Sequence, residues 1–142
     1  MITFLPVPSF EETAKILDYR RLGKQRVEAL MILRILDPNY HSINGKISRW
    51  TNHPATKMWI GYEKMLQEYT LAMCDEWIGR GYKDTISPEI ASFKFTDDIT
   101  PPWIGSEKFH LSHQSNLVRK VPGYYGPIFP GVADNLPYFW PG

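Results

Sequence analysis

Apolar residues recur at helical spacing along several stretches of the chain. Ser9–Glu12 has the pattern of a capping box, and the apolar residues after it are spaced by four and three, which predicts a first helix. Gly23 follows, and because glycine weakens a helix interior by about 1 kcal/mol relative to alanine, we expect a kink or a short turn there. A second helix is predicted over 24–36. Pro38 ends it, since proline disfavours helical geometry in the residue before it, and a loop is expected over 37–54.

The strongest amphipathic pattern lies in the middle of the chain. Pro54 suits the first position of a helix, with Asn52 or His53 as the N-cap. Apolar and aromatic residues spaced by one, three and four over 55–78 predict one long helix. Gly79–Gly81 is typical of a C-terminal cap.

Shorter elements are expected towards the C-terminus. Ser87-Pro88 indicates the start of a short helix that runs to about residue 95. Ser106 is placed to cap a last helix over 107–120, and Pro122 is expected to end it. The remaining residues combine many aromatic side chains with proline and glycine, so we expect an extended tail that lies along the helices.

The composition fits one globular domain over 1–142. Of the 142 residues, 43% are hydrophobic and 14% aromatic, which is enough for a sizeable core. We therefore expect a compact all-α domain with one long central helix and an extended, aromatic-rich tail. No long apolar run suggests a membrane span, and the first residues lack the pattern of a signal peptide. Cys74 is the only cysteine, so a reducing, cytoplasmic setting is expected.

The net charge of +1 hides a segregation of charge along the chain. Residues 15–34 carry a net charge of +4 and residues 106–120 a net charge of +2, so the remaining segments are acidic. A concentrated basic element binds a polyanion through its local potential, even when the whole chain is near neutral. Two ordinary solvated helix faces would produce the same pattern.

The junction between the first two predicted helices is the more basic of these segments. Guanidinium and ammonium groups neutralise phosphates, and glutamine reaches base edges or sugars. A solvated helix face, with Lys24 and Glu28 paired one turn apart, is the alternative interpretation. The candidate DNA-binding residues of this junction are Arg20, Arg21, Lys24, Gln25 and Arg26.

The last predicted helix carries a second polar cluster. His110 and His113 are candidates for catalysis or for hydrogen bonds to phosphates or a sugar, and structural histidines with satisfied hydrogen bonds are the alternative interpretation. His-x-x-His is also half of a metal site, but the sequence holds no matching His/Cys cluster, so we expect no metal ion and no cofactor. The candidate DNA-binding residues of this helix are Gln114, Arg119 and Lys120.

A third cluster precedes the long helix. Helix N-termini attract anions through free N–H groups and the helix dipole, and an indole ring stacks on nucleobases. Trp50, Asn52 and His53 are therefore candidate DNA-binding residues. A capping loop whose tryptophan closes the core would explain the same residues. Nucleophilic triads, phosphate-binding loops and dinucleotide-binding fingerprints are absent from the sequence.

Several motifs, in order along most of the chain, resemble those of the pyrimidine dimer DNA glycosylases, the phage-type endonuclease V repair enzymes. These motifs are the segment Leu17–Leu22 that leads to Arg26, the segment Arg80–Thr85 after the long helix, and the late His/Ser/Gln helix followed by Pro122 and Tyr124-Tyr125. The segments similar to a bacterial-type branch of the family are Arg21–Arg26, Asn52–Ala55 and Ser112–Ser115.

The resemblance implies a small all-α enzyme that grips double-stranded DNA on its basic face and extrudes a nucleotide; we expect a monomer. In the family an N-terminal α-amine attacks the sugar C1′ to form a Schiff base, a glutamate assists, and strand cleavage follows by β-elimination. Such an amine is a sensible nucleophile, because α-amines have a pKa of about 7.7–8.0 against about 10.4 for lysine. Arg20 and Arg26 match the family's DNA-contacting arginines.

Two positions depart from the family pattern. The family glutamate falls at Arg21, which reverses the charge. The bulky Ile2 indicates that Met1 is retained and would itself supply the amine. Glu28 or Glu11 would then have to supply the carboxylate.

Three hypotheses follow for the function. The first is a DNA glycosylase or abasic-site lyase that acts on damaged or modified bases by base flipping. The second is a non-catalytic module that binds DNA through the same surface. The third is an enzyme that acts on a small phosphorylated or nucleoside substrate through His110, His113 and the arginines.

Overall fold

The computed structural model describes residues 1–39 and 48–141, and over these residues it contains helices and irregular segments but no strand. The predicted all-α class is confirmed. The part of the predicted loop that spans 40–47 lies outside the described residues. The helices are α1 (Phe10–Ile16), α2 (Tyr19–Leu36), α3 (Pro54–Lys57), α4 (Glu63–Gly79), α5 (Ser87–Ser92), α6 (Glu107–Lys120) and α7 (Pro122–Tyr125). Among the described helices, none combines the length and apolarity that a membrane-spanning segment requires.

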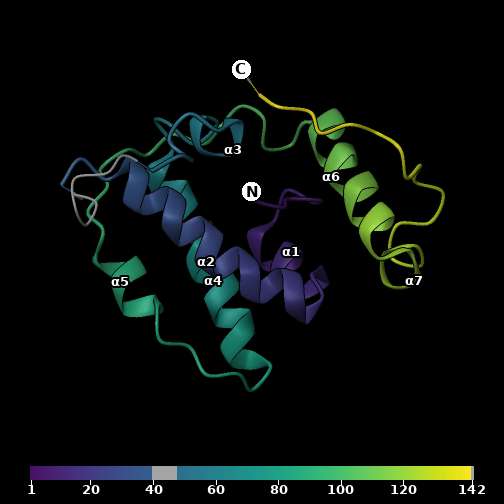
Figure 1. Cartoon of the computed structure of the whole chain (residues 1–142), viewed down its shortest axis with the longest axis horizontal. Helices are drawn as coiled ribbons and strands as arrows, with labels where there is room; N and C mark the ends of the chain where they lie inside the picture. Colours follow the sequence, from purple (N-terminus) through teal and green to yellow (C-terminus); the bar gives the residue numbers. More distant parts are fainter. Residues whose placement is uncertain (40–47, 142) are drawn as a thin grey trace.

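The N-terminal segment runs through the middle of the molecule rather than over its surface. Helix α2 packs along α4, and α1 packs against the same helix. The first residues of the chain lie between this layer and α6 (Figure 1). Ile2–Leu5 are buried there, beside the aromatic core formed by Trp59, Tyr69 and Phe109. The N-terminus is therefore fixed by the same core that holds the helices together.

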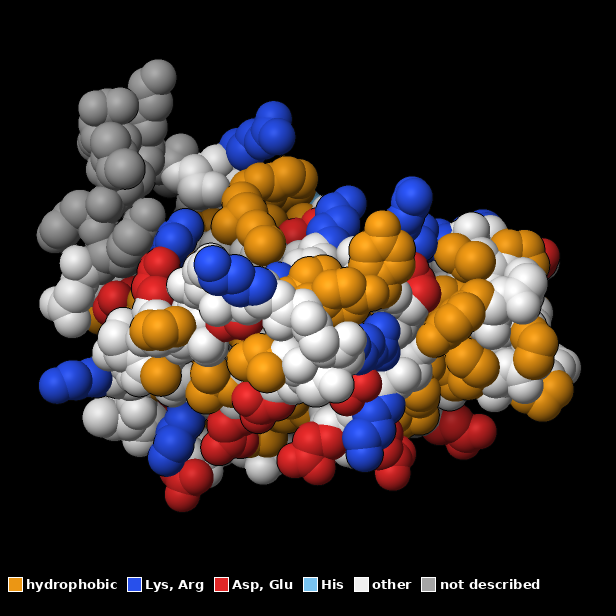
Figure 2. Space-filling view, turned by 90° about the horizontal axis from the view of Figure 1, so that it is seen from below, with side chains coloured by type: hydrophobic (Ala, Val, Ile, Leu, Met, Phe, Trp, Pro, Cys, Tyr) orange, Lys and Arg blue, Asp and Glu red, His pale blue; other side chains and the backbone are white. Residues whose placement is uncertain are grey.

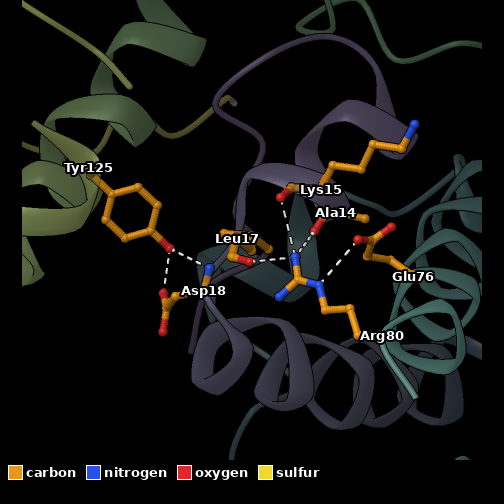
Figure 3. A network of polar contacts seen from close by, with 7 residues as sticks. All are labelled: Ala14, Lys15, Leu17, Asp18, Glu76, Arg80 and Tyr125. Carbon is orange, nitrogen blue, oxygen red and sulfur yellow. Dashed lines mark hydrogen bonds and ion pairs between the residues drawn. The ribbon is translucent and has the colours of Figure 1, made fainter. Parts of the chain in front are cut away.

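The break between the first two helices lies at Leu17 and Asp18, several residues before the position predicted from Gly23. Both residues are extended, and α2 runs without interruption through Gly23. The guanidinium of Arg80 satisfies the carbonyl oxygens that α1 leaves free at its C-terminal end (Figure 3). Arg80 donates to the carbonyl oxygens of Ala14, Lys15 and Leu17, at 3.0, 3.2 and 2.7 Å.

Tyr125 holds the other side of the same junction. Its hydroxyl accepts a hydrogen bond from the backbone N–H of Asp18 at 3.0 Å and donates one to the Asp18 carboxylate (Figure 3). Burial, followed by the hydrogen bond to Asp18, raises the pKa of the tyrosine, so the hydroxyl remains a donor. The C-terminal part of the chain thus fixes the point at which α2 begins.

The predicted long helix over 55–78 is wrong at its N-terminal end. The chain forms the short helix α3, a turn that contains Gly61 in a left-handed conformation (φ 88°), and then α4. The apolar spacing continues through the turn because Met58 and Trp59 are themselves buried in the core. Periodicity alone therefore could not reveal the break, and Gly61 was its only signal.

Most of the other predicted helix ends are confirmed. Ser9, His53 and Ser106 accept hydrogen bonds from the first turns of α1, α3 and α6, and Gly81 follows α4 with a φ of 92°. Pro122 begins the short α7 rather than only ending α6. The tail lies along α6 as predicted. Asn116 donates to the carbonyl oxygen of Leu136, and the hydroxyls of Ser115 and Ser112 accept from the backbone N–H groups of Leu136 and Phe139.

Gly23 provides a test of the contact between α2 and α4. A Cβ atom at this position would stand 2.9 Å from Cη2 and Cζ3 of Trp77. Glycine-to-alanine changes in open helix positions usually stabilise a helix by about 1 kcal/mol, whereas overpacking costs about 1–3 kcal/mol. We therefore expect Gly23→Ala to lower the free energy of unfolding, as measured by chemical denaturation.

Gly79, the last residue of α4, is the matched control, since no atom lies within 4 Å of the place a Cβ would take. Gly79→Ala should leave the free energy of unfolding unchanged or raise it slightly. A Gly23→Ala variant as stable as the Gly79→Ala variant would show that Trp77 moves freely.

Candidate functional site

The side chain of Gln25, on α2, anchors the N-terminal segment. Its Nε2 donates to the carbonyl oxygen of Ile2 at 3.0 Å, and its Oε1 accepts from the backbone N–H of Phe4 at 2.8 Å. The hydroxyl of Tyr69 shares its one proton between the carbonyl oxygen of Phe4, at 2.7 Å, and Oε1 of Gln25, at 2.9 Å. Indole Nε1 of Trp59 donates to the Thr3 hydroxyl at 3.0 Å. Chain termini are usually mobile unless they are tied down, and here side chains tie the terminus down.

Two histidines of α6 form hydrogen bonds with the backbone of Leu5. Nδ1 of His113 accepts from the backbone N–H of Leu5 at 2.8 Å, so the proton of the neutral ring is on Nε2. His110 has the opposite tautomer: its Nε2 accepts from the N–H of Gly105 at 2.8 Å, and its Nδ1 donates to the carbonyl oxygen of Leu5 at 2.8 Å. Burial lowers the pKa of both rings, and together with the nearby His110 it lowers that of His113 to about 3.

The anchored terminus opens into a cleft of about 350 Å³, lined by Met1, Ile2, Phe4, Arg20, Arg21, Lys24, Gln25, Glu28 and Lys120. The cleft lies between the first residues, one face of α2 and the end of α6. Oε2 of Glu28 accepts a hydrogen bond from the backbone N–H of Ile2 at 3.4 Å. This bond sets the carboxylate of Glu28 beside the second residue of the chain, and Met1 and Glu28 line the same cleft.

Four cations line this cleft, and two of them have acidic neighbours. Nζ of Lys24 lies 3.7 Å from Glu28, but its side chain is 73% exposed, so this pair contributes little to stability. Nη1 of Arg21 lies 3.3 Å from the Asp18 carboxylate. Arg20 and Lys120 are exposed. The cleft thus has an excess of positive charge around its single lining carboxylate.

Charge is segregated on the surface as well as along the sequence. On the face in Figure 2, most acidic side chains gather towards one edge, whereas several Lys and Arg side chains stand along the opposite edge. Hydrophobic side chains lie between the two. Such a distribution leaves a positive edge on a chain whose net charge is only +1.

The helical repeat relates Glu28 to Arg21. They are seven residues apart on α2, which is close to two full turns, so both project from one face of the helix into the same cleft. Glu11, the other candidate carboxylate, is exposed and lines a different pocket between α1 and α4. Of the two candidates, Glu28 alone lies at the N-terminus.

Arg26 is turned into the protein and not towards the cleft. Its guanidinium makes an ion pair with the carboxylate of Asp84 at 2.6 Å and lies 4.6 Å from the centre of the Trp77 ring. Both members of the pair are almost completely buried. Burial raises the pKa of Asp84, but hydrogen bonds from Ser87 and Arg26 outweigh it and lower the pKa to about 2. We therefore leave Arg26 out of the proposed interface.

Other predicted site residues also have partners within the protein. Gln25, His110 and His113 are buried against the N-terminal segment, and Gln114 donates to the carbonyl oxygen of Pro6 at 2.8 Å. These four residues thus anchor the N-terminal segment. Gln25 also lines the cleft, whereas His110, His113 and Gln114 do not. Arg119 is exposed and donates to the backbone of Asp134 at 3.4 Å.

The third predicted cluster surrounds the start of α3. Asn52 is exposed, and Trp50 and His53 are half-buried. Nδ1 of His53 accepts from the backbone N–H of Ala55 at 3.0 Å, which confirms His53 as the N-cap. No group of three or more His, Cys, Asp or Glu residues that could hold a metal ion occurs within 1–39 and 48–141.

The comparison with protein families concerns the N-terminal part of the chain. A model of the family described as pyrimidine dimer DNA glycosylase matches residues 1–89, more than half of the chain. The chain belongs to the pyrimidine dimer DNA glycosylase family. The match includes the N-terminal segment and the face of α2 that lines the cleft, whereas α6 and the tail of this glycosylase-family chain lie beyond it. No curated protein and no solved structure matches the chain.

Sequence reasoning missed the residues that build the junction around this site. Arg80 and Asp84 belong to a segment that the family resemblance singled out, yet they cap α1 and pair with Arg26. The contacts of Arg80 with Leu17 and of Asp84 with Arg26 each join residues more than fifty positions apart, so local sequence patterns do not reveal them. Membership in the motif was the only sign that Arg80 and Asp84 matter.

We expect Arg26→Ala to destabilise the protein. Removing one partner of a buried ion pair leaves the other charge without compensation, which costs about 3–5 kcal/mol of unfolding free energy. Thermal and urea denaturation would measure the loss. Arg20→Ala is the matched control, because Arg20 is exposed, and its stability should change little. Equal stability of the two variants would refute a structural role for Arg26.

We also expect the stability of the protein to fall as the pH decreases from about 6.5 towards 5. His113 is neutral in the folded state with a pKa of about 3, whereas an unfolded histidine titrates near 6.5. The unfolded state therefore binds more protons in this range, and stability rises with pH. Protonated Nδ1 would also face the Leu5 N–H, donor against donor.

The measurement is the urea denaturation midpoint at several pH values for the wild type and for His113→Gln. Glutamine retains an acceptor for Leu5 but does not titrate, so the variant should show a shallower pH dependence even if it is less stable throughout. The same slope in both proteins would contradict the assignment.

Proposed function

We propose that the protein is a DNA glycosylase with abasic-site lyase activity, in which the α-amine of Met1 is the nucleophile and Glu28 is the assisting carboxylate. The observation that carries this proposal is the anchored N-terminus, which lies beside Glu28 in a cleft lined by cations, in a chain of the pyrimidine dimer DNA glycosylase family. Damaged or modified bases in double-stranded DNA are the proposed substrates.

The proposed reaction begins with an attack of the neutral amine nitrogen on C1′ of the target sugar. The N-glycosidic bond breaks, and the base leaves with the bonding electron pair and takes up a proton. The attached nitrogen then loses one proton, and its lone pair expels the ring oxygen O4′, which takes up a proton. The product is an iminium ion, the protonated Schiff base. Removal of a C2′ proton then expels the 3′ phosphate by β-elimination, and water releases the amine.

Glu28 suits the proton transfers of this scheme. A carboxylate next to the amine stabilises the cationic iminium and accepts a proton, and general acid–base help of this kind contributes about 10²–10⁴-fold to a rate. Its hydrogen bond to the Ile2 N–H holds the carboxylate beside the second residue of the chain. Glu11 is not proposed, because it faces a different pocket.

The cations of the cleft suit the phosphates that flank an extruded nucleotide. Arg20, Arg21 and Lys24 come from one face of α2, and Lys120 comes from the end of α6. We propose that the two helices contact the DNA backbone on either side of the N-terminus. Such binding weakens steeply as salt rises, because phosphate contacts release counterions. The protein would act as a monomer inside the cell.

A non-catalytic DNA-binding module is the second candidate. It is favoured by Arg21, which places a cation where the family has its glutamate. The third hypothesis, an enzyme for a small substrate, loses its catalytic residues, since His110 and His113 bind Leu5.

Borohydride trapping on a duplex with an abasic site tests the enzyme proposal. We expect a covalent protein–DNA adduct whose DNA-bearing peptide contains Met1, and an N-terminal extension should abolish it. Glu28→Gln should slow trapping by about 100-fold or more, because the carboxylate is lost while the volume is kept. Glu68→Gln, an exposed position on α4 outside the cleft, is the matched control and should trap at the wild-type rate.

The other outcomes separate the candidates. Salt-sensitive DNA binding without an adduct would leave the non-catalytic module. An adduct on Lys24 instead of Met1 would contradict the assignment of the amine.

A further inference from the structure

The second residue of the chain is held to α2 at both of its backbone polar groups. The N–H of Ile2 donates to Oε2 of Glu28 at 3.4 Å, and its carbonyl oxygen accepts from Nε2 of Gln25 at 3.0 Å. Gln25 and Glu28 are three residues apart on α2, and side chains at this spacing are neighbours on the surface of a helix. Ile2 therefore lies against one face of α2, fixed at two points.

These two hydrogen bonds leave the α-amine of Met1 little freedom. A peptide bond is planar, so the N–H of Ile2 and the α-carbon of Met1 lie in one plane. Once this plane is fixed, the amine nitrogen moves only by rotation about the Met1 Cα–C bond. Standard bond lengths keep it within about 4 Å of the Ile2 nitrogen at every angle of that rotation. The bonds at Ile2 thus determine where the amine stands in the cleft.

The amide of Gln25 has one favourable orientation. Its Oε1 accepts from the N–H of Phe4 at 2.8 Å and from the hydroxyl of Tyr69 at 2.9 Å. Flipping the amide would set its NH₂ group against the Phe4 N–H, donor against donor, and its oxygen against the carbonyl oxygen of Ile2. Burial, followed by the charge of Glu28, raises the pKa of Tyr69 well above its usual value, so the hydroxyl remains a donor. Tyr69 thus orients the amide, and the amide orients Ile2.

Gln25 is better placed to hold the N-terminus than to contact DNA. It lines the cleft but is only 1% exposed, and both ends of its amide bind the N-terminal segment. Unlike the carboxylate of Glu28, a neutral amide does not titrate and is no general acid or base. The anchors on α6, His110 and His113, bind Leu5, which is three residues further from the amine. Gln25 therefore binds closer to the amine along the chain than either histidine.

We propose that Gln25 is a positioning residue of the lyase reaction, which holds Ile2 so that the α-amine of Met1 is directed at C1′ of the target sugar. This inference rests on the proposed function and deepens it. A displacement of about 1 Å in a reacting group costs about 100-fold in rate. Loss of the Gln25 anchor should therefore slow the covalent step and leave the affinity for DNA unchanged.

The test is the variant Gln25→Met, which keeps the length of the side chain and removes both hydrogen-bonding groups. Two quantities are measured on the folded protein. One is the rate constant of borohydride trapping at a saturating concentration of abasic duplex. The other is the affinity for a duplex that carries tetrahydrofuran, an abasic analogue that forms no Schiff base. We expect trapping to be about 100-fold slower than in the wild type, at an unchanged affinity.

Gln67→Met is the matched control. Gln67, on α4, uses its amide in the same way on another segment, since its Nε2 donates to the carbonyl oxygens of Ile90 and Phe93 at 2.8 and 3.0 Å. It lies outside the cleft, so this variant should become less stable while its trapping rate and DNA affinity remain those of the wild type. Equal slowing of the two variants would reduce the effect to general destabilisation and overturn the proposal.

Tyr69→Phe carries the same test in a variant that retains the buried ring. It removes only the hydroxyl that binds Phe4 and orients the amide of Gln25. Trapping should slow less than in Gln25→Met, again at an unchanged affinity. If Gln25→Met does not fold, a wild-type trapping rate in Tyr69→Phe would contradict the proposed role.

Two results in a folded Gln25→Met variant would refute the role of Gln25 alone. One is trapping at the wild-type rate, and the other is an affinity that falls in proportion to the trapping rate, which would make Gln25 a DNA contact. In both cases the wild type still forms its adduct, so the proposed function stands. A wild type without any adduct would refute the proposed function and, with it, this role of Gln25.

Discussion

The structure depends on how the first six residues are held. The backbone groups of Ile2, Phe4, Leu5 and Pro6 bind side chains from α2, α4 and α6, and no neighbouring strand is involved. Buried backbone polar groups must find partners, so an extended segment inside an all-α protein requires polar residues in its walls. Gln25, Tyr69, His110 and His113 meet this need. The polar stripes of α2 and α6 therefore exist as much for the terminus as for any ligand.

The packing of α2 also divides the positive charges near its start between the protein interior and the cleft. The sequence suggests one continuous cationic face, but the structure divides it. Arg26 faces inward and pairs with Asp84, while Arg20, Arg21 and Lys24 line the cleft. Arg80 and Tyr125 hold the two sides of the junction at which α2 begins (Figure 3).

The predictability of the structure follows from the range of the interactions involved. The caps at Ser9, Ser106 and His53 depend on contacts within three residues. The sequence predicted the first two and narrowed the third to Asn52 or His53. The position of the α1–α2 break depends on Arg80, more than sixty residues away, and Gly23 was misleading because its small size serves the packing of Trp77.

The candidate site shows the same division. Chemistry suggested Met1 as the amine and Glu28 or Glu11 as the carboxylate, and of the two carboxylates Glu28 lines the cleft with Met1. The opposite tautomers of His110 and His113, and the approach of Trp140 to His53, could not be predicted, because they depend on how α6 and the tail fold back onto the first residues. Composition identifies such residues but does not assign their partners.

The two departures from the family pattern, Arg21 in place of the glutamate and Ile2 after Met1, both concern the charges around the N-terminal amine. An iminium cation at the N-terminus would be destabilised by Arg21 if no carboxylate replaced the family glutamate, since like charges repel strongly in a cleft partly shielded from water. Glu28 restores a negative charge on the same face of α2, about two turns or 10 Å further along the helix. Its hydrogen bond to the Ile2 N–H places that charge beside the second residue of the chain. Arg21 in turn lies next to Asp18, which partly compensates its charge. In the proposed mechanism, a carboxylate shifted along the helix and a cation with its own acidic neighbour together provide negative charge in the cleft that Met1 lines.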